Sequence, residues 1–212
     1  IKTIQLYNAT IEDKIKACID VSGWIIRSGT TINEEIIRAS KHLRAIGRAG
    51  VGIDNIDILA ATRNGVIVMN TPDVNTISAA EHTIAMMLAL SRNISQGDHE
   101  LRQNKWNRHL LVGTELRNKT LGIVGLGKIG REVMSRSLPF GMNILGYDPF
   151  VNQKMFNEDE IRIVELYELL EQSDFITIHV PLNSETKNLF NKDRLKKMKN
   201  TAIAKIETIE HS

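Results

Sequence analysis

The sequence predicts an α/β protein of two lobes, each built on a parallel sheet. Short apolar runs alternate with stretches of helical periodicity, which is the order expected of successive strand–helix–strand units. This alternation is interrupted once, by a long apolar stretch of helical spacing at 77–94 and a polar stretch after it. We therefore expect one domain at 1–70, a second at 119–212, and a crossover segment at 71–118.

The first domain is expected to alternate short strands with helices whose starts are marked by capping residues. Thr10 and Asp13 form a capping box for a helix that ends at Ile19. Thr31 and Asp54 are the expected caps of the next two helices, which end at residues 39 and 63. The strands are expected at 2–7, 23–27, 43–48 and 66–69, and the continuous apolar run of the last one predicts burial on both faces.

The second domain shows the same alternation. Its first strand holds Leu121, Ile123 and Val124, and a helix with Val133 and Met134 on its apolar face follows. The later strands are expected at 143–147, 161–164, 175–179 and 201–206, with helices at 165–172 and 191–198.

A glycine pattern joins the first strand and the first helix of this second domain. Gly125, Gly127 and Gly130 follow the spacing G-x-G-x-x-G, and Asp148 ends the next strand 18 residues later. Such glycines allow a tight turn, close approach of the backbone to a pyrophosphate, and close packing of helix on strand. The acid is placed to bond the adenosine ribose of NAD and to repel the 2′-phosphate of NADP. A glycine-rich turn without a ligand is the competing interpretation.

Composition excludes several classes of partner. The 27 Lys and Arg residues are scattered among 25 Asp and Glu, so nothing indicates binding to nucleic acid. No apolar run reaches the roughly 20 residues that a membrane span needs, and we expect no membrane partner and no metal site. A single cysteine, Cys18, rules out an internal disulfide framework and predicts a reducing compartment, the cytoplasm.

Two arginines in the first domain follow predicted strands. Arg27 and Ser28 come after one strand, and Arg48 precedes the glycine-rich turn of Gly50 and Val51 after another. Ligands of parallel sheets bind at the carboxyl ends of strands, and the planar guanidinium matches carboxylate or phosphate. This predicts a site for a small acidic molecule. The spacing alone equally allows both arginines to cap helices or pair with surface acids.

Several segments resemble the D-2-hydroxyacid dehydrogenase family over roughly residues 1–200. They are RAGVGIDNID, VMNTPDVNTISAAEHT, GTELRNKTLGIVGLGKIGRE, FGMNILGYDPF and DFITIHVPL. The resemblance implies a flavodoxin-like substrate lobe and a doubly wound Rossmann NAD-binding domain with strand order 3-2-1-4-5, both incomplete. It also implies that 71–118 contains a dimerisation segment, so that the protein forms a homodimer or homotetramer.

Within the family, the segments IRSGT and RAGVGIDN favour the members that oxidise 3-phosphoglycerate to 3-phosphohydroxypyruvate with NAD, in serine biosynthesis. One alternative is a hydroxypyruvate or glyoxylate reductase. Another, of a different class, is a non-catalytic NAD sensor that resembles the co-repressors built on this fold.

The resemblance also implies roles for individual residues. Arg27 and Ser28 would contact the substrate phosphate, with Arg108 as a further phosphate ligand. The turn of Gly50 and Val51 would receive the carboxylate beside Arg48, and Asn75 would be a polar residue of the site. The residues expected to bind the cofactor are Val51, Gly125, Gly127, Lys128, Ile129, Gly130, Asp148, Val180 and Pro181. His82 and His179 lie outside the family's catalytic motif, and we expect them to be structural.

The sequence departs from the family near residue 209. Ile209 stands where the family has its carbonyl-polarising arginine, and the family's Glu–His pair has no counterpart. Hydride transfer at C2 needs a group that takes the hydroxyl proton and positive charge against the developing alkoxide. We therefore expect no catalytic residue and very low turnover in residues 1–212. We also expect a fragment, truncated at both ends.

Overall fold

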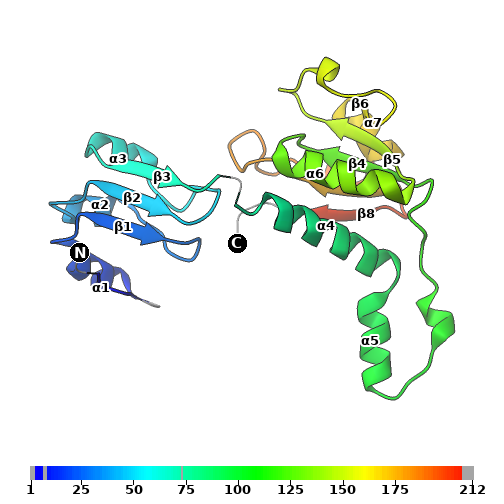
Figure 1. Cartoon of the computed structure of the whole chain (residues 1–212), viewed down its shortest axis with the longest axis horizontal. Helices are drawn as coiled ribbons and strands as arrows, with labels where there is room; N and C mark the ends of the chain where they lie inside the picture. The colour runs from blue at the N-terminus through cyan, green and yellow to red at the C-terminus, as the bar shows by residue number, and fades with distance from the viewer. Residues whose placement is uncertain (1–2, 7–8, 73, 207–212) are drawn as a thin grey trace. The chain divides into compact units, whose positions relative to one another are not determined.

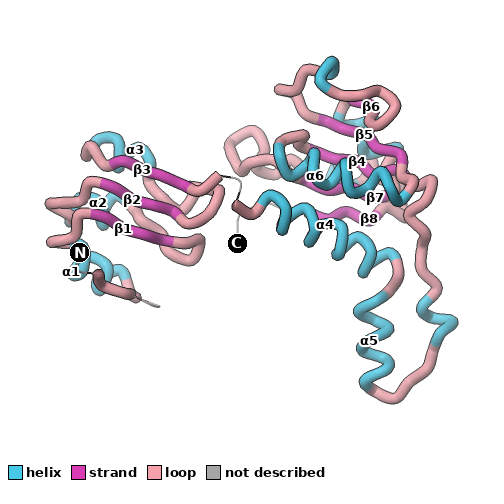
Figure 2. The backbone as a smooth tube through the Cα atoms, viewed as in Figure 1, coloured by secondary structure: helices cyan, strands magenta, loops and turns pink. Residues whose placement is uncertain are grey.

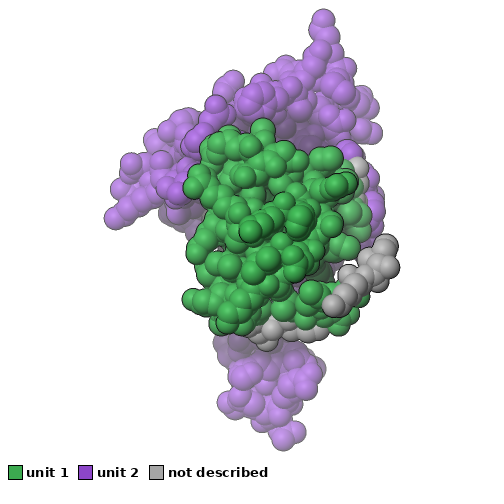
Figure 3. Space-filling model, turned by 90° about the vertical axis from the view of Figure 1, so that its left-hand side faces the viewer, with its two compact units in different colours: residues 1–75, 209–212 green, residues 76–208 purple. Residues whose placement is uncertain are grey.

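The computed structural model describes residues 3–6, 9–72 and 74–206. The chain separates into two compact units at the junction of Asn75 and Thr76, here called unit 1 and unit 2 (Figure 3). The functional division of the chain at residues 70 and 118 stays a prediction. Across the described residues, every helix is too short or too polar to span a membrane.

Unit 1 is a three-stranded parallel sheet with helices packed on one face (Figures 1 and 2). Its strands are β1 (Gly23–Ile26), β2 (Ala45–Arg48) and β3 (Ile67–Asn70), in the order β1-β2-β3. Its helices are α1 (Ile11–Cys18), α2 (Glu34–Ala39) and α3 (Ile58–Arg63). Ile36 of α2, Ala60 of α3 and Ile46 of β2 are fully buried, so the core lies between these helices and the sheet.

The opposite face of this sheet is open, and the prediction that 66–69 is buried on both faces is wrong. Ile67 and Met69 are 63% and 54% exposed, and Ile25 on β1 is 89% exposed. A continuous apolar run is typical of a strand that is covered on both faces, but α1, α2 and α3 all pack on the same face of this sheet. Apolar composition alone does not tell on which side of a sheet the helices pack.

Two of the predicted helix caps are also corrected. α2 is capped by Asn33, whose Oδ1 accepts from the Ile36 N–H at 3.1 Å, and α3 by Asp57. The cause is a parallel bridge between Ile32 and Ile56, which holds both segments extended so that both helices start later. The capping box of Thr10 and Asp13 is confirmed. Residues 3–6 do not form the predicted strand, and the rest of 2–7 includes residues outside the described ranges.

Unit 2 is a five-stranded parallel sheet. Its strands are β4 (Thr120–Val124), β5 (Asn143–Tyr147), β6 (Arg162–Ile163), β7 (Phe175–Ile178) and β8 (Ile203–Ile206). Their order in space is β6-β5-β4-β7-β8, which is 3-2-1-4-5 when counted from β4 and confirms the predicted topology. The helices are α4 (Thr76–Ser91), α5 (Ile94–Arg102), α6 (Lys128–Ser137), α7 (Leu166–Gln172) and α8 (Lys192–Leu195), with short 3₁₀ turns η1 (Arg108–Leu111), η2 (Leu138–Phe140) and η3 (Gln153–Met155).

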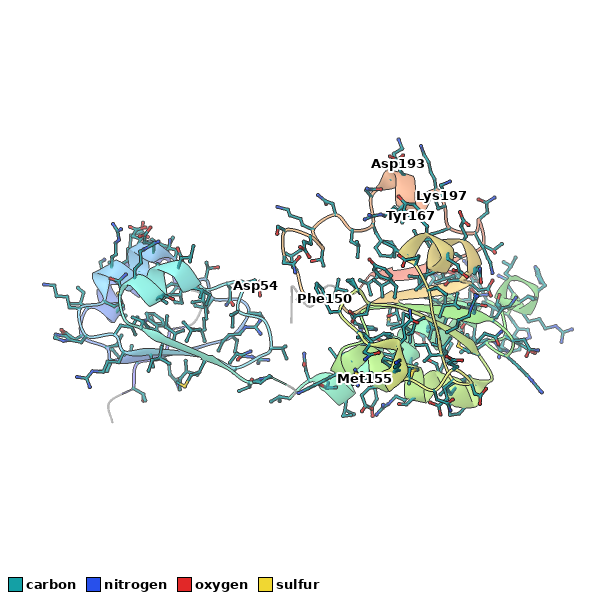
Figure 4. The ribbon with its side chains drawn as sticks, turned by 90° about the horizontal axis from the view of Figure 1, so that it is seen from above. Asp54, Phe150, Met155, Tyr167, Asp193 and Lys197 are labelled. Atoms are coloured by element: carbon teal, nitrogen blue, oxygen red, sulfur yellow. The ribbon has the colours of Figure 1, made fainter. Side chains whose placement is uncertain are left out.

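The central strand β4 is buried on both faces. Leu121, Ile123 and Val124 are at most 1% exposed, with α7 on one side and α6 packed along α4 on the other. Gly122 has no room for a side chain, because a Cβ there would clash with Leu169 of α7 and Ser173. α7 in turn lies beside α8, where the guanidinium carbon of Arg194 is 6.0 Å from the centre of the Tyr167 ring. Tyr167 is labelled in Figure 4.

A helical arm extends from unit 2, where the sequence predicted an irregular stretch. Residues 92–113, called the arm below, contain α5 and η1 and run away from the sheet of the same unit (Figure 1). α4 ends at Ser91, and Asn93 adopts a left-handed conformation with φ 52° that redirects the chain. The base of the arm is closed by the Thr114 N–H, which donates to Ser91 O at 2.7 Å.

Asp174 ties together three strands at the amino edge of the unit 2 sheet. Its carboxylate accepts from the Thr120 N–H at 2.9 Å and from Lys199 Nζ at 2.8 Å, and its carbonyl accepts from Ile203. Burial raises the pKa of this carboxyl, but the hydrogen bonds from Lys199 and Thr120 outweigh burial and hold the pKa below its ordinary value.

We predict that Asp174→Asn lowers the free energy of unfolding at pH 7 by about 1 kcal/mol, since the pair is partly exposed. Because the native pKa is depressed, the stabilisation is present above the unfolded pKa of about 3.9 and is lost as pH falls through the native pKa. Urea unfolding followed by circular dichroism at pH 7 and at acid pH measures this difference.

The matched control is Asp193→Asn, because the Asp193 side chain is 89% exposed and pairs with Lys196 at 3.6 Å. This control is expected to change stability by less than about 0.5 kcal/mol. A deficit of Asp174→Asn that persists undiminished at acid pH would contradict the electrostatic explanation.

Candidate functional site

The glycine turn after β4 has one open side. Gly125 adopts φ +92°, and a Cβ there would lie 2.5 Å from the carbonyl oxygen of His179. At Gly130 a Cβ would clash with the carbonyl oxygen of Gly125, which is the reason that α6 can pack so close to the strand. A Cβ on Gly127 meets nothing within 4 Å. Protein atoms therefore leave no room for a side chain at Gly125 and Gly130, whereas Gly127 is open to a ligand.

The accessible glycine is also the N-cap of α6. Because the cap residue is Gly127, it contributes no side chain to the first N–H groups of the helix. The N-terminus of a helix carries partial positive charge, and its N–H groups bind anions. Lys128, the first residue of α6, and Ile129 after it bring their N–H groups to this end. The geometry fits a phosphate or pyrophosphate at this position.

Asp148 lies at the tip of the neighbouring strand β5 and is held by two backbone groups. Its Oδ2 accepts from the Leu126 N–H at 2.9 Å, and its Oδ1 accepts from the Phe150 N–H at 3.0 Å. Figure 4 shows Phe150 in the loop that follows β5. The carboxylate is thereby fixed next to the glycine turn, with further lone pairs for the hydroxyls of a ribose.

The strand on the other side of β4 completes this edge. The His179 N–H donates to Val124 O at 2.7 Å, and the His179 ring shares a 2.8 Å hydrogen bond with Thr177 Oγ1. His179 is only 8% exposed, which supports its interpretation as a structural residue. Val180 is half-buried and Pro181 is exposed just beyond it, so both follow the carboxyl end of β7 as predicted.

Unit 1 presents a second edge of the same kind. The last residues of the three parallel strands are in register, Ile26 opposite Arg48 and Arg48 opposite Asn70. The residues that follow β1, β2 and β3 therefore lie at one edge of the sheet, formed by the carboxyl ends of the strands. Arg27 is exposed there and Ser28 is half-buried. The structure thus brings together the arginines that the sequence placed in one acidic-ligand site.

Arg48 is buried, with the carboxylate of Asp54 nearby, because a Cβ on Gly52 would approach both groups. It is 3% exposed, and among the described residues neither its Nε nor its Nη1 has a hydrogen-bond partner. A Cβ on Gly50 would clash with this guanidinium, so the side chain lies against the turn of Gly50 and Val51. A buried cation is costly unless it is paired, so the arrangement is suited to an anion that arrives from outside.

Three polar residues that hold these loops were missed by sequence reasoning. Asn55 Nδ2 donates to the carbonyl oxygens of Arg27 at 3.1 Å and Thr30 at 2.6 Å. Asn70 Nδ2 donates to Val51 O at 2.7 Å, and the Thr71 N–H donates to Gly50 O at 3.0 Å. Their position directly after a strand or a glycine turn was the available signal. Asp54, labelled in Figure 4, lies in the same set of loops.

The remaining expected site residues lie elsewhere. Asn75 is half-buried at the end of unit 1, and Arg108 is exposed at the start of η1 on the arm of unit 2. Ile209 lies outside the described residues. No cluster of His, Cys, Asp and Glu in the described part of the chain could hold a metal ion.

Comparisons with known proteins identify the family of this chain. Residues 84–204 match the model of the D-isomer specific 2-hydroxyacid dehydrogenase, NAD binding domain. The chain belongs to the D-isomer specific 2-hydroxyacid dehydrogenase family. NAD is accordingly the cofactor of the domain that carries the glycine turn and Asp148, and the α/β fold and the cofactor expected from the sequence are confirmed.

Curated members of the family are similar along most of the chain. The D-3-phosphoglycerate dehydrogenase of Synechocystis is 49% identical over 178 residues, 84% of this chain and 32% of that protein. The protein of that name from Archaeoglobus fulgidus is 46% identical over 192 residues, 91% of this chain and 36% of the relative. The chain thus spans about a third of the length of the curated relatives it matches.

Solved structures of the family have the same fold. The NAD-dependent formate dehydrogenase of Staphylococcus aureus in complex with NAD has a TM-score of 0.86 at 34% identity, covering 93% of this chain and 60% of the other. The Aquifex aeolicus D-lactate dehydrogenase complexed with NAD and lactic acid has a TM-score of 0.84 at 28% identity, covering 92% and 58%.

The three glycines predict two different mutant phenotypes. Gly127→Ala should fold, with a loss of at most about 1 kcal/mol from the poorer cap. It should weaken NADH binding about tenfold or more if the open side of the turn binds the pyrophosphate, because the methyl group would occupy that side. Gly130→Ala should destabilise unit 2 by about 1–3 kcal/mol through overpacking. NADH fluorescence titration and urea unfolding measure the two effects. Equal stability losses in both variants would contradict the open-side assignment.

Proposed function

We propose that the chain carries the nucleotide and substrate lobes of an NAD-dependent dehydrogenase that converts 3-phosphoglycerate to 3-phosphohydroxypyruvate, as in serine biosynthesis. When bound, NAD supplies the acceptor for the hydride that leaves C2 of the substrate. The observation that supports the substrate assignment is the buried guanidinium of Arg48, whose Nε and Nη1 have no hydrogen-bond partner among the described residues, at the same sheet edge as Arg27. The names and identities of the curated relatives support it.

Arg48 and the turn beside it would receive the substrate carboxylate. A carboxylate there would supply the hydrogen-bond acceptors that the described residues do not give to Nε and Nη1. The turn of Gly50 and Val51 is held by Asn70 and Thr71, so its backbone is fixed before the ligand arrives. This is the preorganisation expected of a binding loop.

Arg27 and Ser28 would bind the phosphate, with Asn75 as a further polar residue of the site. Asn55 fixes the loop that carries them by bonding to the carbonyl oxygens of Arg27 and Thr30. Arg108 is proposed as a third cation toward the phosphate. More than one arginine is expected in such a site, because a doubly anionic phosphate next to a carboxylate carries more negative charge than one guanidinium balances.

The cofactor would be held along the carboxyl edge of unit 2. The N–H groups of Lys128 and Ile129 would meet the pyrophosphate at the N-terminus of α6. Asp148 would bond the adenosine ribose and exclude a 2′-phosphate by charge repulsion, which favours NAD over NADP. Val180 and Pro181 would line the adenosine side, and Val51 would approach the cofactor from unit 1.

A non-catalytic NAD sensor is the alternative of a different class, but such a sensor has no need for the arginines of unit 1. The alternative of a hydroxypyruvate or glyoxylate reductase needs Arg48 but not a phosphate site at Arg27.

Two arginine substitutions test the substrate assignment. Arg48→Met should abolish binding of 3-phosphoglycerate while leaving the stability of unit 1 unchanged or higher, because the charge removed is buried and lacks hydrogen-bond partners at Nε and Nη1 among the described residues. Arg27→Ala should weaken 3-phosphoglycerate about tenfold or more and leave glyoxylate unaffected. Isothermal titration calorimetry in the presence of NAD measures both.

Arg38→Met is the matched control, because Arg38 is exposed and pairs with Glu34 at 2.8 Å in the same unit. It should bind ligand like the unmodified chain. An equal effect of Arg27→Ala on 3-phosphoglycerate and glyoxylate would favour the reductase, and unaltered binding in Arg48→Met would refute the carboxylate site.

We also propose that the arm of unit 2 mediates a homodimer, on which a tetramer can be built. The arm has no fully buried residue in α5 or η1. Five of its apolar side chains are 53–79% exposed to solvent, which is unfavourable unless a partner covers them. They are Ile94, Leu101, Trp106, Leu110 and Val112.

The double substitution Trp106→Glu with Leu110→Lys should convert the dimer to a monomer, because both residues are more than half exposed on the arm and would place charge in the interface. Sedimentation equilibrium measures the mass. Tyr167→Glu, at a 53% exposed aromatic residue on α7, is the control and should leave the mass unchanged. A monomeric unmodified chain would refute the role of the arm.

A further inference from the structure

The backbone of Leu126 is held from both sides within the glycine turn. Its N–H donates to Asp148 of the β5 tip at 2.9 Å. Its carbonyl oxygen accepts from Arg131 Nε of α6, also at 2.9 Å. The Leu126 side chain is fully buried, so the residue itself does not touch a ligand. The two bonds instead fix the orientation of the peptide planes on either side of it.

The second of these planes joins Leu126 to Gly127, the N-cap of α6 at which a Cβ would meet nothing within 4 Å. The Leu126 carbonyl and the Gly127 N–H belong to one rigid peptide unit, in which they point in opposite directions. Holding the carbonyl toward Arg131 therefore aims the Gly127 N–H away from Arg131 and fixes the plane that leads into the N–H groups of Lys128 and Ile129. A flip of this plane would present a carbonyl oxygen to the pyrophosphate, and glycine at 127 gives the least steric resistance to such a flip.

Arg131 is itself held by an aromatic ring. Its guanidinium carbon lies 5.0 Å from the centre of the Phe156 ring, within the range of a cation–π interaction. Phe156 belongs to the connection between β5 and β6, so this contact ties α6 to the segment that follows Asp148. The ring restricts the guanidinium to an orientation in which Nε reaches the Leu126 carbonyl.

We propose that Arg131, supported by Phe156, is a positioning residue that locks the Leu126–Gly127 peptide in the orientation that binds the cofactor pyrophosphate. This inference deepens the proposed function and rests on NAD binding at the glycine turn. Arg131 acts through the backbone of Leu126, and its charge is not the decisive property. A residue of this kind matters for ligands with a pyrophosphate and much less for adenosine alone.

Binding of NADH, ADP and adenosine to the full chain tests the proposal, with thermal unfolding recorded for every variant. Arg131→Ala should weaken NADH and ADP about tenfold, the effect of one lost charge-assisted hydrogen bond, and change adenosine by less than about twofold. Phe156→Leu keeps the arginine charge and should weaken NADH and ADP about threefold. Arg131→Lys, which lacks the planar fork, should restore only part of the affinity.

Arg136→Ala is the matched control, because Arg136 is on the same helix, pairs with Glu132 and does not reach the glycine turn. It should bind all three ligands like the unmodified chain. Equal losses in Arg131→Ala and Arg136→Ala, or full affinity in both Arg131→Lys and Phe156→Leu, would show that charge alone acts and would overturn the proposal. An unmodified chain that does not bind NADH would refute the cofactor site itself, which is a separate outcome.

Discussion

The close contact between the turn after β4 and the first residues of α6 positions the nucleotide edge of unit 2. A side chain at Gly130 would clash with the carbonyl oxygen of Gly125, so only glycine allows the helix to start this near the strand. The contact brings the N-terminus of α6 to the carboxyl edge of the sheet. Since β5 and β7 flank β4, Asp148 and Val180 arrive at the same edge without further constraint.

Unit 1 builds its ligand edge by a related device, with polar side chains in place of glycine packing. The bridge between Ile32 and Ile56 joins the loops after β1 and β2, and Asn55 beside it holds the carbonyl oxygens of Arg27 and Thr30. Within this frame Arg48 is buried with no hydrogen bond at Nε or Nη1 from the residues that the structure describes, which lowers stability in the absence of a ligand. A buried guanidinium of this kind is expected in a site that binds an anion.

Most elements of the fold were predictable from apolar runs, because β4, β5 and β7 of unit 2 are runs of mostly buried residues bounded by turn residues. The errors have physical causes. Thr31 and Asp54 are good caps in isolation, but the Ile32–Ile56 bridge keeps the backbone extended and moves both helix starts to Asn33 and Asp57. α5 was missed because its residues are mostly polar, and none of them is buried.

The sequence by itself determined the family and the cofactor class, because these depend on residues close together in the chain. Only the tertiary structure decided how the site groups are held. The bond from Leu126 to Asp148 joins residues 22 apart, and that from Asn55 to Arg27 joins residues 28 apart. Whether Arg48 finds a partner depends likewise on which residues surround it in space. Such contacts follow from packing, which local patterns of residue type do not specify.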